Sequence, residues 1–458
     1  MKNNRILLYT QKALVITTIV ASALVLTGCG KKQTATSSKN KIVLNVWRTF
    51  DDDLSFTQAI ASYEKAHPEV TINYSKKDIA DYETQSLSAL AAGTGPDIWS
   101  IPNEWMERQR DKLIPMPDGF TKTNKDQRDN ETFYKDTWAA VTVPDNLSDH
   151  KIYGIPLYVD TLALYVNPLM WAEAKDAYRK ANQTNPQFDD SLFRHPPATW
   201  NELLDELPYL TKKDAAGNIT QAGIALGTSN NVPFSADILS LLMLQNGTIM
   251  TDQSQKSARF NTYQNDSSNK PVYNGTSALT FYTNFAKLGS SAYTWNSDQE
   301  NALKAFMDGK VAIMVAYEYV AQALYQQTPT LKYDIVPMPQ VKGAAVVNHA
   351  SYWTETVTNN AKRPEYAWDF VLTIGAQPSS YLSATKRPPA LKLDAQSSSY
   401  NVFDTQTRTA QTWPKGKYPE KVKDVLSSMI NDVVVKNQPA QAAIDNAATT
   451  TTELLRKP

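Results

Sequence analysis

Hydrophobic and polar positions follow two different periods along the first part of the chain. Residues 41–50 read KIVLNVWRTF and residues 70–75 read VTINYS, and both are rich in the β-branched and aromatic side chains typical of strands. Residues 55–67 space apolar side chains at helical intervals, and the alanine-rich segment 82–95 predicts a second helix. Residues 96–101, PDIWSI, predict a third strand. Strands and helices in alternation favour a parallel α/β sheet.

The pattern changes after residue 150. Residues 152–168 form a long stretch of alternating apolar and aromatic positions. The other predicted elements are a helix capped by Thr199, helices at 235–246 and 276–288, a helix and an apolar strand within 300–320, a strand at 333–340, a helix at 363–374 and two helices within 420–457. About 417 residues follow residue 41, more than the ~250–300 at which a single core stops growing, so two domains are expected.

Residues 1–28 differ from the rest of the chain. Three basic and no acidic side chains precede the uncharged, mostly apolar run ALVITTIVASALVLT at 13–27. This is the pattern of a secretory signal peptide, and the run is short for a membrane-spanning helix. Residues 29–41 are polar and rich in Ser, Thr and Lys, which predicts a flexible tether. We therefore expect the folded part to begin near Ile42.

Cys29 is the only cysteine of the chain, and it ends the apolar run. The sequence LTGC at 26–29 resembles the bacterial lipobox, in which the thiol is acylated and the chain is cut just before it. The resemblance implies lipid attachment at Cys29 and a location at the outer face of the cytoplasmic membrane, because acyl chains hold a protein to a bilayer. An uncleaved anchor or an ordinary signal peptide is the alternative. Acylation of the only cysteine would leave the mature chain without a free thiol for catalysis or metal ligation.

Composition narrows the classes of function. Without residues 1–28 the chain has 43 basic and 46 acidic residues, a net charge of −3, which does not suggest a nucleic-acid partner. The four histidines share no ligand-like spacing, so neither a metal site nor another cofactor is expected. No phosphate-binding glycine loop, H-E-x-x-H or G-x-S-x-G motif is present. Asp160, Glu318 and Glu355 lie in or beside apolar strands and leave a two-carboxylate glycosidase open.

Several segments together resemble extracellular solute-binding protein family 1, the maltose-binding-like receptors of sugar ABC importers. The similarity covers most of 42–375 and includes YETQSLSALAAGTGPDIWSIPNEW at 82–105, YGIPLYVDTLALYVNPLMW at 153–171 and ALKAFMDGKVAIMV at 302–315. It implies a two-lobed, type II periplasmic-binding-protein-like α/β fold in which each lobe is a mostly parallel sheet flanked by helices. Ligand would lie in the cleft, and the closed form would dock on a membrane permease.

The resemblance also implies where the chain passes between the lobes. The first crossover is expected near Tyr158–Thr161, and the second near Val315–Tyr317 with a return near residue 340. Lobe one is then 42–158 plus 316–342, and lobe two is 159–315 plus 343–458.

Candidate ligand contacts follow the first and third strands. Sugars present hydroxyls around rings with apolar faces, so aromatic side chains and carboxylates or amides are the expected contacts. Trp47 and Asp51 stand at the end of the first strand, and Asn103 and Glu104 follow the strand 96–101. Packing inside the lobe is the alternative for Trp47, a helix cap for Asp51, and a simple loop for the other two. Trp99 and Trp368 are interpreted as core residues.

A second group of candidates comes from the resemblance. Asp160 interrupts LYVDTLALYV at the first crossover, where an unpaired buried carboxylate would be unfavourable, and Tyr158 shares the segment. A hinge salt bridge is the alternative for Asp160. Tyr319 stands where the family has a stacking tryptophan, with Tyr317 beside it, and Trp353 matches an aromatic position before a strand.

The chain departs from the family pattern at two turns. Tyr317 and Glu318 replace the usual glycine and proline, and Ser351 and Tyr352 replace glycines. Larger residues at glycine positions predict a cleft that is smaller or reshaped.

These features together favour a lipid-anchored receptor without catalytic activity, which passes a sugar or oligosaccharide to ABC permease subunits and acts as a monomer. One alternative keeps the fold but binds a polyamine, a phosphorylated glycerol or a metal ion. The others are a surface-anchored carbohydrate hydrolase and an adhesin or sensor subunit.

Overall fold

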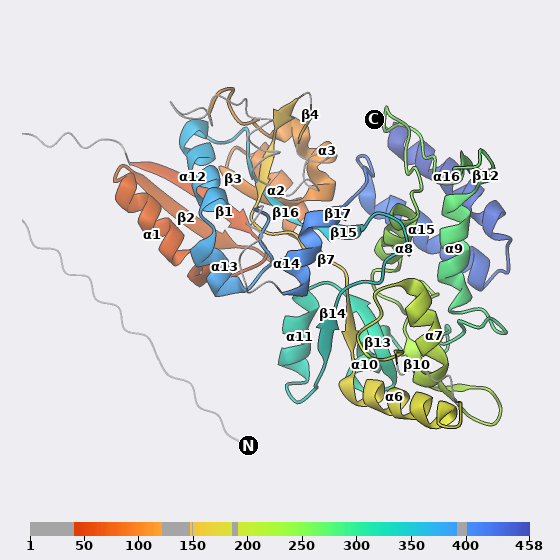
Figure 1. Cartoon of the computed structure of the whole chain (residues 1–458). Coiled ribbons are helices and arrows are strands. Elements are labelled where there is room, and N and C mark those ends of the chain that lie inside the picture. Colours follow the sequence, from red (N-terminus) through yellow and green to blue (C-terminus); the bar gives the residue numbers. More distant parts are fainter. Residues whose placement is uncertain (1–40, 121–146, 149, 186–190, 392–400) are drawn as a thin grey trace, which may run out of the picture. The chain divides into compact units, whose positions relative to one another are not determined.

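The computed structural model describes residues 41–120, 147–148, 150–185, 191–391 and 401–458 (Figure 1). The predicted signal peptide, Cys29 and the tether before residue 41 lie outside the described residues. In the part that is described, no helix is both long and apolar enough to cross a membrane.

Five strands of the described chain form the first sheet: β1 (Ile42–Arg48), β2 (Val70–Lys76), β3 (Ile98–Pro102), β6 (Gly154–Pro156) and β16 (Trp353–Val357). Their order across the sheet is β2-β1-β3-β16-β6. The strands β2, β1 and β3 run parallel, whereas β16 runs antiparallel to both of its neighbours. The strands predicted at the start of the chain are confirmed.

Side chains alternate between two clusters on the faces of this sheet because successive strand residues point to opposite sides. Leu44 and Val46 belong to the larger cluster with side chains from α1 (Thr57–Ala66), α12 (Pro364–Ala376) and α13 (Ser379–Thr385). Trp47 and Trp99 belong to the smaller one, with Tyr82 at the start of α2 (Tyr82–Ala91). Helices from distant parts of the sequence thus cover one sheet (Figure 1). Trp99 and Trp368 are both fully buried, as predicted.

The second sheet has the order β14-β8-β13-β10-β9 among the described residues. Its strands are β8 (Ala163–Val166), β9 (Lys212–Lys213), β10 (Ile219–Ile224), β13 (Val311–Ala316) and β14 (Asp334–Val336). Only the β10–β13 pair is parallel. The first sheet is thus mostly parallel, because β16 alone runs against the other four strands. The second sheet is mixed, because β8 and β9 run against β10, β13 and β14.

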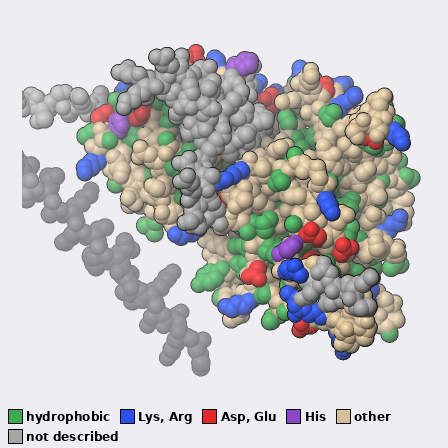
Figure 2. Space-filling view, viewed as in Figure 1, with side chains coloured by type: hydrophobic (Ala, Val, Ile, Leu, Met, Phe, Trp, Pro, Cys, Tyr) green, Lys and Arg blue, Asp and Glu red, His purple; other side chains and the backbone are tan. Residues whose placement is uncertain are grey.

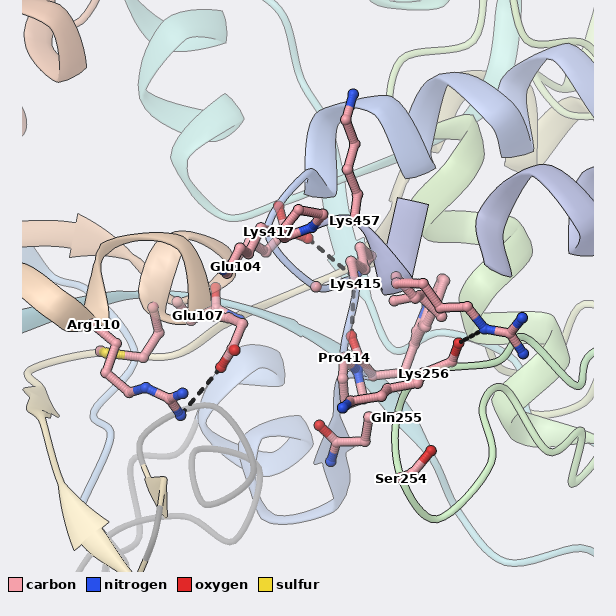
Figure 3. A pocket seen from close by; sticks show the side chains of 17 residues that line it. Glu104, Glu107, Arg110, Ser254, Gln255, Lys256, Pro414, Lys415, Lys417 and Lys457 are labelled. Atoms are coloured by element: carbon pink, nitrogen blue, oxygen red, sulfur yellow. Dashed lines mark hydrogen bonds and ion pairs between the residues drawn. The ribbon is translucent and has the colours of Figure 1, made fainter. Parts of the chain in front are cut away.

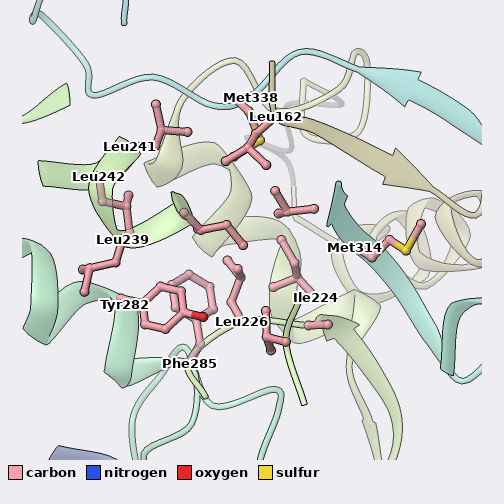
Figure 4. Close-up of a cluster of buried hydrophobic side chains, with 14 of the residues drawn as sticks. Leu162, Ile224, Leu226, Leu239, Leu241, Leu242, Tyr282, Phe285, Met314 and Met338 are labelled. Carbon is pink, nitrogen blue, oxygen red and sulfur yellow. The ribbon is translucent and has the colours of Figure 1, made fainter. Parts of the chain in front are cut away.

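A large hydrophobic cluster packs around the second sheet, and Figure 4 shows part of it. Leu239 and Leu242 come from α8 (Ser235–Gln245), which is buried on nearly every face, as expected of a helix that is hydrophobic all round. The other helices of this region are α6 (Pro168–Asn182), α7 (Trp200–Leu210), α9 (Asn274–Asn284), α10 (Ala302–Met307), α11 (Tyr319–Gln327), α15 (Pro419–Val434) and α16 (Ala440–Arg456). The Thr199 side chain accepts a hydrogen bond from the Glu202 N–H, which confirms the predicted cap of α7.

A three-stranded sheet lies where the chain passes between the two larger ones. It contains β7 (Asp160–Thr161), β15 (Asn348–Ser351) and β17 (Ala410–Gln411) in the order β17-β15-β7. The chain runs from β6 in the first sheet through β7 to β8 in the second, and from β14 through β15 back to β16. Within the stretch 152–168, the strands β6, β7 and β8 join three different sheets, and Ile152 belongs to the small β4–β5 sheet.

The assignment of 316–342 to lobe one is wrong. Strand β14 pairs with β8 in the second sheet, and Tyr333 and Ile335 pack against the core of that sheet. The assignment of the segment after 343 to lobe two is wrong for residues 353–391, which include α12 and α13. Strand β16 lies between β3 and β6, and α12 packs on the first sheet. The apolar side chains of each segment are buried in the core opposite to the one expected.

The remaining described elements are short. They are η1 (Asp53–Ser55), η2 (Asn103–Trp105), α3 (Met106–Gln109), η3 (Arg110–Lys112), β4 (Leu147–Ser148), β5 (Lys151–Ile152), β11 (Gln264–Asn265), β12 (Pro271–Val272), α14 (Val402–Gln406) and η5 (Thr407–Thr409). On the face drawn in Figure 2, acidic and basic side chains are interspersed among uncharged ones.

Candidate functional site

A pocket of about 170 Å³ lies where the chain passes between the sheets, and we call it the crossover pocket. Its lining comes from the loop after β1, from the segment that enters β7, from the start of α11 and from the β15–β16 turn. It brings together four of the nine predicted ligand residues. The lining residues are Phe50, Ile79, Tyr158, Asp160, Tyr319, Ser351, Tyr352, Trp353 and Arg387.

The side chain of Asp160 joins β7 to the start of α11 by accepting hydrogen bonds from backbone N–H groups. Its Oδ1 accepts hydrogen bonds from the N–H groups of Thr161 at 2.7 Å and Glu318 at 2.9 Å, and its Oδ2 accepts a longer one from Tyr319 at 3.4 Å. The side chain is almost fully buried, and burial raises the pKa of this carboxyl to about 7 despite the hydrogen bonds. In the described chain Asp160 therefore accepts backbone hydrogen bonds in place of the hinge salt bridge considered as the alternative, and it also lines the pocket.

Aromatic rings reach the crossover pocket from both sides of the crossover. Trp353, the first residue of β16, packs edge-to-face on Phe50, with ring centroids 5.1 Å apart. Tyr319, the first residue of α11, is 46% exposed and stacks on the buried Tyr317, with centroids 6.0 Å apart and planes 14° apart. Rings of this kind offer flat apolar faces with polar edges, which suit the faces and hydroxyls of a sugar.

Arg387 is a pocket residue that the sequence did not single out. The segment around it runs beside β7, because the Val159 N–H donates to the carbonyl of Pro388. The guanidinium donates from Nε and Nη2 to Asp51 Oδ1, at 3.1 and 3.0 Å, and lies 4.4 Å from the ring centroid of Tyr158. Arg387 therefore already has a carboxylate partner, and it forms a cation–π contact with the wall of the pocket.

Asp51 anchors the loop that carries Phe50. Burial disfavours its ionised form, but the charges of Arg48 and Arg387 outweigh burial and hold the pKa of Asp51 below its usual value. Its Oδ2 also accepts a hydrogen bond from Tyr381 at 2.9 Å. The backbone of Asp51 is left-handed, with φ of 65°, a conformation that Asp tolerates better than most residues. Asp51 is thus an ionic anchor beside the pocket and not the helix cap considered as the alternative.

The other predicted residues lie outside the crossover pocket. Tyr317 is buried, and its hydroxyl hydrogen-bonds with Asp237 and His349, both at 3.0 Å. Trp47 is partly buried in the smaller cluster of the first sheet, with Lys77 Nζ 4.0 Å from its ring centroid. Trp47 therefore packs inside the lobe, which was the alternative to a ligand contact.

Asn103 and Glu104 line a second, larger pocket of about 590 Å³, drawn in Figure 3. Glu104 forms ion pairs with Lys415 at 3.1 Å and with Lys423 at 3.0 Å, and Lys423 also reaches Asp237 at 3.2 Å. Burial opposes ionisation of Glu104, but these two lysines outweigh it and lower the pKa of the carboxyl. Glu104 is the end of a charge network that joins the segment after β3 to α15, so its carboxylate is already engaged.

The acidic residues that line the crossover pocket decide whether it could cleave a sugar. A glycosidase needs two carboxyl groups facing one sugar bond, roughly 5–10 Å apart. Among the described lining residues Asp160 is the only acid, and its oxygens accept backbone hydrogen bonds. The arrangement suits the holding of a ligand between rings better than acid–base chemistry.

Comparison with known proteins agrees with this architecture. A family model of the bacterial extracellular solute-binding proteins matches residues 49–378. A protein of Brucella abortus (strain 2308), which its name describes as a binding protein, is 23% identical over 425 residues that cover 88% of this chain and 90% of the relative.

Two solved structures have a similar fold. The cyclic alpha-maltosyl-1,6-maltose binding protein from Arthrobacter globiformis has a TM-score of 0.70 at 17% identity, covering 91% of this chain and 99% of that one. The sugar-binding protein MalE from Xanthomonas citri has a TM-score of 0.68 at 17% identity, covering 90% and 97%. These likenesses confirm the predicted two-lobed α/β fold. Because the family model matches residues 49–378, well over half of the chain, the chain belongs to the bacterial extracellular solute-binding protein family.

Proposed function

We propose that this protein is a receptor that binds an uncharged saccharide in the crossover pocket and delivers it to an ABC importer. The observation that carries the proposal is the set of aromatic rings from Phe50, Tyr158, Tyr319 and Trp353 around one pocket at the crossover between the sheets. Two proteins of the same fold are named for binding a cyclic maltose derivative and sugar, which supports a ligand of this class.

The crossover pocket has room for a small ligand only. The pocket volume of about 170 Å³ lies below the ~300–1,000 Å³ of sites for drug-sized ligands. Ser351 and Tyr352, which stand where the family has glycines, line the wall and occupy space there. We expect one sugar ring to be enclosed, with any further rings outside the pocket.

Charge in the pocket supports an uncharged ligand. The guanidinium of Arg387 is neutralised by Asp51, and the raised pKa of Asp160 keeps a large share of that carboxyl protonated near neutral pH. An anionic ligand would therefore meet no unpaired cation among the described lining residues, and a cationic one would meet only Asp160, whose carboxyl is about half protonated at pH 7.

Anchoring and transport form the rest of the proposal. Acylation of Cys29 would hold the receptor at the outer face of the cytoplasmic membrane, with residues 29–41 as a tether. A tethered receptor stays at high effective concentration near the permease subunits. Each lobe would supply part of the ligand contacts, so ligand binding would favour a closed, monomeric receptor without catalytic activity.

A thermal-shift screen of residues 41–458 against mono- and oligosaccharides tests the binding function. A ligand at 100 times its Kd stabilises the folded state by about 2.7 kcal/mol. We expect Trp353→Ala to remove most of that shift, because it deletes one wall of the pocket. Tyr325→Ala is the matched control, since this aromatic side chain is 70% exposed on α11 and does not line the pocket.

Two results would contradict the proposal. One is the absence of a shift with any saccharide, and the other is an unchanged shift in Trp353→Ala. Chromatography of the incubated sugars provides a third check, because steady cleavage would identify a hydrolase instead of a receptor.

A further inference from the structure

Two exposed tyrosines that do not line the crossover pocket contact each other. Tyr263 is 59% exposed and Tyr273 is 45% exposed, and their ring centroids are 6.1 Å apart with planes 61° apart. Among the described residues the other strongly exposed tyrosines are Tyr319, which lines the crossover pocket, and Tyr325. Exposed aromatic side chains that gather in one place mark interaction sites more often than single ones do.

The tyrosine pair belongs to an open groove of about 600 Å³, which we call the tyrosine groove. The groove lies between the segment 259–265, the residue before α9 and the first turns of α16. None of its residues lines the crossover pocket. The lining residues are Arg259, Asn261, Thr262, Tyr263, Gln264, Asn265, Tyr273, Gln441 and Asp445.

The polar side chains of the groove are held in place by each other. Asp445 Oδ1 accepts hydrogen bonds from Asn261 Nδ2 at 2.8 Å and from Gln441 Nε2 at 3.0 Å. Gln441 is fixed further, because its Oε1 accepts from the Thr276 hydroxyl at 2.7 Å. Asp445 Oδ2 receives no hydrogen bond from the described residues, so one oriented acceptor remains for a ligand hydroxyl.

The chemistry of the lining indicates an uncharged, hydroxyl-rich ligand. Arg259 and Asp445 are its one basic and one acidic residue, so the lining carries no net charge. Amides and a carboxylate bind hydroxyl groups, and tyrosine rings cover the apolar faces of sugar rings. A groove of about 600 Å³ that is open to solvent leaves room for a chain to continue outside it.

We propose that the tyrosine groove is a second carbohydrate-binding site, which holds a neutral glycan chain of several rings. The two tyrosine rings support successive parts of the chain, and Asp445 and its amide neighbours bind the hydroxyls. The site goes beyond the proposed receptor function, because it shares no residue with the crossover pocket and does not need that pocket to work.

Affinity electrophoresis through gels that contain neutral glucans tests this site. The probes are soluble starch, an α-glucan, and hydroxyethyl cellulose, a β-glucan, and they separate the two ring linkages. We expect the protein to be retarded in at least one gel and Tyr263→Ala/Tyr273→Ala to lose at least tenfold in affinity. Tyr263→Phe/Tyr273→Phe keeps both rings and should remain retarded. Tyr325→Ala is the control for loss of an exposed tyrosine, and circular dichroism checks that each variant folds.

Trp353→Ala separates the two sites. If the tyrosine groove binds glycans, this variant stays retarded even where its crossover pocket no longer responds to sugar. The proposal is overturned if neither gel retards the protein, if the double alanine variant migrates like the wild type, or if Trp353→Ala alone abolishes retardation. Failure of the receptor function would instead appear in the thermal-shift screen, so the two failures are distinguishable.

Discussion

At the scale of single residues, Asp160 shows how one side chain can serve the fold and the site together. Its carboxyl lines the crossover pocket and also accepts hydrogen bonds from the backbone of β7 and of α11. The sequence identified it because an acid inside an apolar segment needs a partner. The identity of that partner could not be predicted, because Glu318 lies 158 positions away along the chain.

The raised pKa of Asp160 predicts a dependence of stability on pH. Burial raises the pKa of the folded state to about 7, whereas an unfolded Asp titrates near ~3.9. Between these values the folded state binds more protons than the unfolded state, so the free energy of unfolding falls as pH rises from about 4 to about 7. Each unit of pKa difference is worth about 1.4 kcal/mol.

The variant Asp160→Asn isolates this effect. Its amide oxygen can still accept from Thr161 and Glu318, but it does not titrate. Urea unfolding at a series of pH values should show a smaller decline in the variant than in the wild type over this range. Identical slopes in the two proteins would mean that Asp160 is not the group responsible.

At the scale of elements, local pattern identified most helices and strands, while strand pairing depended on distant residues. The predicted strand at 41–50 and the helices at 235–246 and 363–374 are present within a few residues as β1, α8 and α12. The sheet of each strand could not be predicted, because β14 and β16 are short and their own residues do not specify a partner strand. Burial of their side chains against one core or the other decides their place.

Arg48 and Glu355 illustrate what joins such distant elements. The guanidinium at the end of β1 pairs with the carboxylate in β16, and each side chain is at most 2% exposed. Glu355 also accepts a hydrogen bond from Ser100 in β3 at 2.9 Å. This buried pair joins three neighbouring strands of the first sheet and lines no part of the crossover pocket, so it is a structural pair.

Removing one partner of this pair should be more harmful than removing both. We expect Arg48→Met to destabilise the protein by about 3–5 kcal/mol, because Glu355 is left buried without its cation. The double variant Arg48→Met/Glu355→Leu should recover a large part of that loss. Urea denaturation measures both values, and a double variant less stable than Arg48→Met would contradict this account.

At the scale of the whole molecule, polar contacts connect the first-sheet region to the second. Glu104 reaches Lys415 and Lys423, while Trp105 and Arg108 from the same segment bind Glu420 at the start of α15. Lys415 is only 2% exposed, and its ammonium group pairs with Glu104 at 3.1 Å. These contacts involve no residue of the crossover pocket, and they favour the approach of the two regions even without ligand.

Loss of this charge network should loosen the ligand-free protein. We expect Glu104→Gln to increase the radius of gyration measured by small-angle X-ray scattering, because Lys415 would gain by returning to water. Glu107→Gln is the matched control, since Glu107 lines the same pocket but pairs with Arg110 inside its own segment. Equal radii for the wild type and both variants would show that the network does not hold the regions together.

The sequence by itself determined the alternation of strands and helices, the α/β class and the family. Local periodicity carries the first two, and the motifs at 82–105, 153–171 and 302–315 carry the third. It also identified Tyr158, Asp160, Tyr319 and Trp353, which the structure brings to one pocket. Only the tertiary structure decided which sheet β14 and β16 join and that Arg387 reaches the pocket wall. It likewise placed Glu104 in a charge network. The reason is that burial and ion pairing depend on residues far apart in the chain, which no local pattern encodes.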